Sequence, residues 1–265
     1  MNNTLIFNNT YLESEESKIS QFSKDGDIKK IRAFLSDVCG IDAQIDQDII
    51  NPYTRDWSNI PDGNAELLVR PQSNEECAII LNICQMCKIP ITISAGQTNL
   101  TGSATPEGGI ILSTSKLNTP SPCVDIKNQC VMTPIGISLE NMRNEVLKQS
   151  KNTLYYPVDP TSRHDAYVGG TLSCNASGFI PGEKGATRYW VEEIELMLID
   201  GYSLKIKRGE YISLNGRFTI QCGDKNILLP IPKYQRAKIK NASGPYSSMN
   251  NEIDFIDLID LDEKI

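Results

Sequence analysis

The sequence lacks the long apolar segments that would place a protein in a membrane. No part of its 265 residues approaches the roughly 18 consecutive apolar residues that a membrane-spanning helix needs. Its beginning, MNNTLIFNNTYLESEE, has neither a basic segment nor an apolar one, so it does not resemble a secretory signal. We therefore expect no membrane span and a cytoplasmic location.

Positive charge is also scarce. The chain has 26 Lys and Arg against 33 Asp and Glu, a formal net charge of −7. Binding to nucleic acid depends on clustered Lys and Arg that neutralise phosphates, so a nucleic-acid partner is disfavoured. The two diffuse basic stretches, Lys205–Arg208 and Lys233–Lys240, are typical of a solvated face.

Two familiar phosphate-binding motifs are missing. The chain has no G-x-G-x-x-G, and its small-residue loop at 94–108 contains no G-K-[ST]. This loop also joins a predicted strand to another strand, whereas both motifs lead from a strand into a helix. The chain is therefore predicted to be neither a Rossmann dinucleotide-binding protein nor a P-loop protein.

A long loop of small polar residues is present instead. Residues 94–108, SAGQTNLTGSATPEG, lie between the apolar runs IPITI and GIIL. Loops of more than about 12–15 residues without structure of their own are uncommon, and they tend to be functional or disordered. Small side chains let backbone N–H groups approach a ligand, and successive N–H groups can form an anion-binding concavity. The composition thus favours a phosphate or pyrophosphate site, although a plain surface loop remains open.

A second loop-rich region repeats the same composition. Residues 153–182 contain V-G-G-T at 168–171 and N-A-S-G at 175–178. Two such loops, separated by a predicted helix and strands, indicate one extended ligand held from two sides.

The cysteines provide a different hypothesis. Cys77, Cys84 and Cys87 include a C-x-x-C pair, but a metal or iron–sulfur site requires four converging ligands. All three lie on the apolar stripe of one predicted helix, which favours a place in the core. We expect free thiols and no metal.

The pattern along the chain predicts a mixed α/β lobe. Residues 1–26 are polar and acidic and indicate a loosely docked arm, and residues 27–40 form a helix that ends at Gly40. A strand at 67–69, a helix with a Ser73–Glu76 capping box, and strands at 89–93 and 109–113 follow. Further expected elements are two short strands in 121–136, a helix after Ser138, and strands within 191–201 and 203–229.

Five ordered segments resemble one family. ITISAGQTNLTGS at 91–103 is similar to V-V-P-R-G-G-G-T-S-L-T-G-G, the pyrophosphate loop of FAD-linked oxidases of the vanillyl-alcohol oxidase type. RPQSNEEC, YPVDPTS with VGGTLSCNASG, GATRYWVEEIELMLIDG, and IPKYQRAKIKNASGPY with DFIDLI follow the family order over about residues 50–259. The best match is the branch of glycolate oxidase FAD subunits and D-lactate dehydrogenases.

The resemblance implies an α+β, PCMH-type FAD-binding domain of two α+β lobes with FAD between them. We expect an arm and helix at 1–49 and the FAD-binding domain at 50–265, with lobes at about 50–115 and 120–259. Carried over by position, three groups of residues would bind FAD. The pyrophosphate would contact Ser94, Ala95, Gly96, Gln97, Thr98, Asn99, Thr101 and Gly102. The flavin and ribityl part would contact Asp159, Ser162, Gly169, Gly170, Asn175 and Gly178. The adenine would contact the backbone around Glu195 and Met197.

The sequence departs from the family at several points. Gln97 replaces a glycine of the family loop, and a left-handed glycine position would resist it by roughly 1 kcal/mol or more. Either Gln97 adopts an allowed conformation or the affinity for FAD falls. The loop lacks the His that carries covalent FAD in some members, so FAD is expected to bind non-covalently. The only histidine, His164, is expected to be a partly exposed loop residue. The family's cap domain does not follow DLDEKI, which leaves the catalytic residues unassigned.

The resemblance implies a flavin-dependent oxidoreductase that oxidises a 2-hydroxy acid such as lactate or glycolate. It would act with a separately encoded cap or an electron-transfer subunit. Arg163 and Arg188 are candidate anion binders, and structural salt bridges explain them equally well. The alternative hypothesis is a truncated or vestigial flavin-binding module without turnover.

Overall fold

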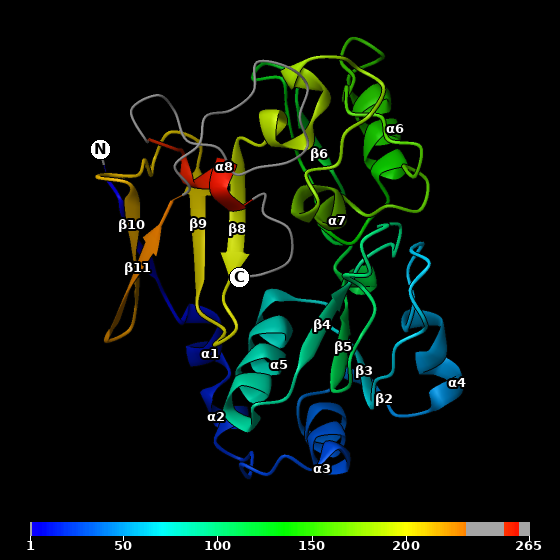
Figure 1. Ribbon diagram of the computed structural model, residues 1–265, viewed down its shortest axis with the longest axis vertical. Helices are drawn as coiled ribbons and strands as arrows, with labels where there is room; N and C mark the ends of the chain where they lie inside the picture. Colours follow the sequence, from blue (N-terminus) through cyan, green and yellow to red (C-terminus); the bar gives the residue numbers. More distant parts are fainter. Residues whose placement is uncertain (1, 232–251, 260–265) are drawn as a thin grey trace.

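The computed structural model describes residues 2–231 and 252–259, and most of the segment IPKYQRAKIKNASGPY lies outside them. Figure 1 shows mixed helices and strands, and the fold is α+β. The helices are α1 (Thr10–Ser14), α2 (Glu16–Ile19), α3 (Ile28–Ala33), α4 (Gln47–Ile50), α5 (Asn74–Cys87), α6 (Leu139–Gln149), α7 (Val168–Ser173) and α8 (Phe255–Ile259). The strands are β1 (Thr4–Phe7), β2 (Asp42–Gln44), β3 (Leu67–Arg70), β4 (Ile91–Ser94), β5 (Ile110–Ser113), β6 (Cys123–Asp125), β7 (Cys130–Met132), β8 (Glu193–Met197), β9 (Ser203–Lys207), β10 (Arg217–Cys222) and β11 (Lys225–Pro230).

One sheet has the order β2-β3-β5-β4. β5 runs parallel to both β3 and β4, and β2 is antiparallel to β3. All four residues of β5 are buried, as expected for a central parallel strand. β2 was not predicted from the sequence, because three residues are too few to give a strand pattern.

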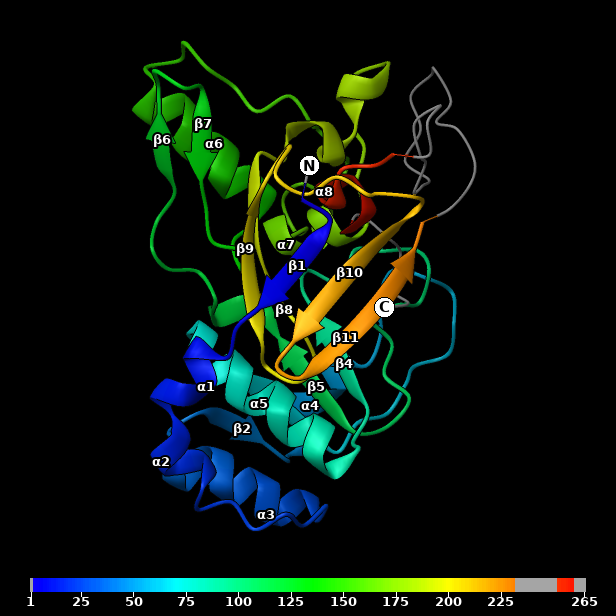
Figure 2. The ribbon, with the colours of Figure 1, turned by 90° about the vertical axis from the view of Figure 1, so that its left-hand side faces the viewer.

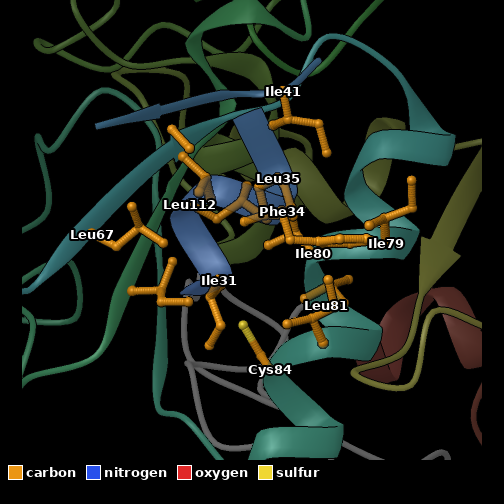
Figure 3. Close-up of a cluster of buried hydrophobic side chains, with 14 residues drawn as sticks. Ile31, Phe34, Leu35, Ile41, Leu67, Ile79, Ile80, Leu81, Cys84 and Leu112 are labelled. Carbon is orange, nitrogen blue, oxygen red and sulfur yellow. The ribbon is translucent and has the colours of Figure 1, made fainter. Parts of the chain in front are cut away.

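Helix α5 covers this sheet, and its N-terminus forms as the sequence predicted. The Ser73 hydroxyl accepts from the Glu76 N–H, and the Glu76 carboxylate accepts from the Gln72 N–H. Figure 3 shows Ile80 of α5 directed toward Phe34 and Leu35, within the cluster that also holds Ile79 and Cys84. Phe34 and Leu35 belong to the wider helical turn, Phe34–Val38, that continues α3.

The remaining strands form separate sheets. β1 pairs in parallel with β10, which pairs with β11, and β8 and β9 form a hairpin (Figure 2). The expectation of a loosely docked arm was wrong for residues 4–7, since β1 is hydrogen-bonded along its length. Leu5, in the middle of β1, is fully buried. Its short apolar run, LIF, was the missed signal.

A third group packs the hairpin β6–β7 against α6. Val124 and Val131 contact the buried Met142 and Val146 of α6. The Ser138 hydroxyl accepts from the Asn141 N–H, so this helix begins at the predicted residue.

Candidate functional site

The small-residue loop connects two adjacent parallel strands. β4 ends at Ser94, and β5, its parallel neighbour, begins at Ile110. A parallel pair needs a crossover of a dozen or more residues, and in most proteins a helix provides it. Here an irregular segment makes the crossover, so the topology explains the length of the loop but not its composition.

The backbone of this loop leaves donors unused. Within residues 2–231 and 252–259, the N–H groups of residues 97–101 donate to no protein acceptor. The Ser94 hydroxyl, at the start of the loop, is buried and has no hydrogen-bond partner among the described residues. Burying a hydroxyl without a partner costs free energy, which applies to Ser94, whereas residues 97–101 are half-buried or exposed. Successive N–H groups without a protein acceptor fit an anionic ligand such as a pyrophosphate.

Gln97 has a left-handed backbone, with φ of +56°, at the position of a glycine in the family loop. Its side-chain amide donates to the carbonyl oxygens of Pro52 at 3.2 Å and Arg55 at 2.5 Å. The side chain therefore faces the segment before β3, and only its backbone N–H is available to a ligand.

The second loop region meets the first through backbone contacts. A Cβ on Gly96 would lie 2.0 Å from the carbonyl oxygen of Asp165, and a Cβ on Gly170 would lie 3.2 Å from the side-chain Cβ of Ala95. These glycines allow two distant parts of the chain to touch, so the two small-residue loops lie against each other. That they hold one extended ligand from two sides stays a prediction. A Cβ on Gly178 would lie 2.3 Å from the backbone nitrogen of Asp159.

A cavity of about 440 Å³ opens where the loops meet. Ligand-binding pockets usually have volumes of about 300–1,000 Å³. The cavity is lined by Pro52, Tyr53, Ala95, Gly96, Gln97, Ser113, Ser115, His164, Asp165 and Tyr167. Burial, followed by the nearby Tyr53 and Asp165, raises the pKa of Tyr167, so its phenol stays protonated at neutral pH.

Several of these lining residues were missed from the sequence. Ser113 is the last residue of β5, Ser115 lies just after it, and Tyr53 comes from a turn distant in sequence. Ligands often bind at the carboxyl ends of parallel strands, and this rule could have indicated Ser113. His164 is exposed at the cavity, so it is a loop residue as expected.

Other candidate residues have their side chains engaged within the protein. The Asp159 carboxylate accepts from Arg163 at 2.7 Å and lies 3.4 Å from Arg143, and Arg163 also pairs with Glu140. Arg163 is therefore a structural salt-bridge residue. Ser162 uses its carbonyl oxygen to accept from two N–H groups of the following turn.

The Asn175–Arg188 pair is buried. The Asn175 side chain accepts from the Arg188 N–H at 2.9 Å, and both residues are at most 2% exposed. Neither is placed at the cavity surface. Gly169, at the start of α7, would meet Ile135 if it carried a Cβ.

The two adenine candidates lie on β8, away from the cavity lining. The Glu195 carboxylate accepts from the Tyr11 hydroxyl at 2.6 Å, and Met197 packs against the core under α5. Thr98, Thr101 and Gly102, which were predicted to contact the pyrophosphate, lie in the first loop outside the residues that line the cavity. Whether each of the predicted residues contacts FAD stays a prediction.

The cysteines do not form a metal site in the described part of the chain, where no group of three His, Cys, Asp or Glu could hold an ion. Burial raises the pKa values of Cys77 and Cys84 to about 12, so both thiols remain protonated. Eight free cysteines are present, as expected for a chain without a disulfide framework. Within residues 2–231 and 252–259, every helix is too short or too polar to span a bilayer.

Comparison with known proteins places this site in a family. The D-lactate dehydrogenase of Anaerostipes hadrus is 34% identical over 142 residues, which cover 53% of this chain and 29% of that protein. The glycolate oxidase subunit GlcD of Bacillus subtilis is 30% identical over 149 residues, which cover 56% and 30%. The chain thus spans about 30% of the length of these relatives.

The solved structure of a glucooligosaccharide oxidase from Acremonium strictum superposes with a TM-score of 0.55 at 17% identity. The match covers 65% of this chain and 35% of that one. At this identity the similarity establishes only the fold, which is that of FAD-linked oxidases. The family described as FAD binding domain matches residues 65–207, just over half of the chain. With the free loop donors and the cavity beside them, this match shows that the chain belongs to the FAD-binding-domain family of PCMH-type, FAD-linked oxidoreductases.

Proposed function

We propose that this chain holds FAD non-covalently, with the pyrophosphate on the loop at 94–108. The observation that carries the proposal is the run of free N–H groups at 97–101, which begins at Gln97 on the cavity lining. Backbone donors with no protein acceptor can bind phosphate oxygens without first breaking internal hydrogen bonds. The hydroxyls of Thr98 and Thr101 would add donors from the same loop.

The composition of the loop, which includes neither His nor Cys, supports non-covalent binding. The oxidase from Acremonium strictum is described with FAD attached to a cysteine and a histidine. In this chain His164 is exposed at the cavity, on the side of the second loop. Acid precipitation of the flavin-loaded protein tests this point, since non-covalent FAD leaves with the supernatant.

We further propose that the completed protein oxidises a 2-hydroxy acid such as lactate or glycolate. The support comes from the relatives, which include a D-lactate dehydrogenase, a glycolate oxidase subunit and D-2-hydroxyglutarate dehydrogenases. FAD, when bound, supplies the hydride acceptor. The reaction also needs a base and a carboxylate-binding cation, which a separately encoded cap or an electron-transfer subunit would provide.

The division into lobes at about 50–115 and 120–259 belongs to the same proposal. Separate buried clusters support it: one lies between α5 and the β2-β3-β5-β4 sheet, and another lies between β9, β10 and α8. Residues 1–49 would then form an additional segment that contacts both clusters.

An absorption spectrum tests the proposal directly. The purified chain is incubated with FAD and desalted, and retained flavin bands support FAD binding. Anaerobic addition of D-lactate or glycolate then tests the proposed substrates. Bleaching of the bound flavin would support turnover, whereas retained but unreduced flavin would favour the binding module without turnover. Absence of retained flavin would contradict the proposed function.

A further inference from the structure

The pyrophosphate loop is backed by a second layer of chain, residues 51–60, here named the connector. Gln97 donates from its side chain to two connector carbonyls, as described above. At the other end of the loop, a Cβ on Gly102 would lie 1.7 Å from the side chain of Ile60. The loop therefore contacts the connector on both sides of residues 98–101.

Asp56 lies between these two contacts. One oxygen of its carboxylate, Oδ2, accepts from Asn99 Nδ2 at 2.6 Å, and the other, Oδ1, accepts from the Ser58 N–H at 2.8 Å. The Ala104 N–H is a further donor to it. Burial would raise the pKa of Asp56, but the hydrogen bonds from Ser58, Asn99 and Ala104 outweigh it and lower the pKa. The group is therefore a carboxylate at neutral pH.

Asn99 carries this contact into the loop itself. Its amide nitrogen also donates to the Ser103 hydroxyl at 2.7 Å, so one side chain joins the connector to the far end of the loop. The amide of Asn99 is thus engaged, and its backbone N–H is free within the described residues. The side-chain amides of Gln97 and Asn99 face the connector, whereas successive backbone donors remain available.

We propose that Asp56 is a positioning residue that holds the loop in the shape in which the N–H groups of residues 97–101 converge on the pyrophosphate. This proposal rests on the proposed FAD site. A carboxylate accepting three hydrogen bonds fixes Asn99 and Ala104 more firmly than a neutral acceptor would, because hydrogen bonds to charged groups are the stronger ones. Preorganised donors bind more tightly, since the ligand does not bear the cost of ordering them.

The competing arrangement puts the Asp56 carboxylate where a phosphate would sit. The two arrangements predict opposite effects of removing the charge. If the carboxylate supports the loop from the connector side, its removal weakens FAD binding. If it occupies the place of the phosphate, its removal strengthens FAD binding, because like charges repel over short distances.

The test compares Asp56→Asn and Asp56→Ala with Asp62→Asn, a matched control on the exposed chain just after the connector. FAD affinity is measured by flavin fluorescence at two salt concentrations, and the stability of the FAD-free chain by urea unfolding. We expect Asp56→Ala to weaken FAD binding by about 10- to 100-fold. Asp56→Asn should bind FAD with an intermediate affinity, because the amide keeps one acceptor oxygen. Asp62→Asn should bind FAD as tightly as the wild type.

Tighter binding by Asp56→Asn, or affinities within twofold for all variants, would overturn the proposal. Hydrogen exchange of the FAD-free chain separates this outcome from failure of the FAD site. The amides of Ala104 and Thr105, bonded to Asp56 and to the Gly102 carbonyl, should exchange faster in Asp56→Ala. If the wild type retains no FAD, the proposed function fails. If the amides of Ala104 and Thr105 then exchange at the same rate in Asp56→Ala as in the wild type, the supporting role of Asp56 in the loop is refuted as well.

Discussion

Replacement of Gln97 by glycine tests how the loop tolerates a non-glycine residue at a left-handed position. The backbone of Gln97, with φ of +56°, is strained by about 1 kcal/mol relative to glycine. The same side chain makes two hydrogen bonds to connector carbonyls. Such bonds contribute about 0.5–1.5 kcal/mol each to stability, and less where the groups are half exposed.

These two effects oppose each other. Gln97→Gly should therefore change the free energy of unfolding by about zero to −1 kcal/mol, as relief of strain offsets part of the lost bonding. Gln97→Ala keeps the strain and loses both hydrogen bonds, so it should be about 1 kcal/mol less stable than Gln97→Gly. Urea unfolding followed by circular dichroism measures these differences.

Gln129 provides a matched control within the same chain. It has φ of +55° and is exposed, and no hydrogen bond of its side chain is recorded among the described residues. Gln129→Gly should therefore stabilise the protein by about 1 kcal/mol, because strain is relieved without loss of bonding. Equal effects of the two Gln→Gly changes would refute the stabilising role of the Gln97 amide, and equal stability of Gln97→Gly and Gln97→Ala would refute the strain.

Three other changes address the frame around the site. Hydrogen bonds from Gln44, Lys116 and Arg70 outweigh burial and lower the pKa of Asp42 to about 2. The folded-state pKa of Asp42 lies below its unfolded value, so the carboxylate contributes about 2 kcal/mol of stability above about pH 4, and this contribution disappears as the pH falls toward 2. In urea unfolding, Asp42→Asn should therefore be less stable than the wild type above pH 4, and the difference should vanish at low pH. Gly96→Ala should cost about 1–3 kcal/mol in urea unfolding and weaken FAD binding, since its Cβ would meet a backbone oxygen at 2.0 Å. Ile80→Ala, in the fully buried face of α5, should cost about 2–5 kcal/mol in thermal or urea unfolding without altering the flavin spectrum of the folded fraction.

The regular elements could be predicted where their signals are local. The Ser73–Glu76 cap and the period of apolar residues specify α5, and Ser138 specifies the start of α6. The left-handed position of Gln97 was likewise accessible from the sequence, because it aligns with a glycine of the family loop. Strands β1 and β2 could not be recognised, since each is short and becomes a strand only through a partner distant in sequence.

The sequence by itself determined the family, the two small-residue loops and the absence of other phosphate-binding motifs, because these depend on residue types in a fixed order. Only the tertiary structure decided which groups of the loops remain free to bind. It turned the side chains of Gln97 and Asn99 toward the connector, engaged Asp159 with two arginines, and brought Gly96 against the backbone of Asp165. Hydrogen bonds between segments tens of residues apart cannot be read from spacing, since they arise only when the sheet and the loops have packed.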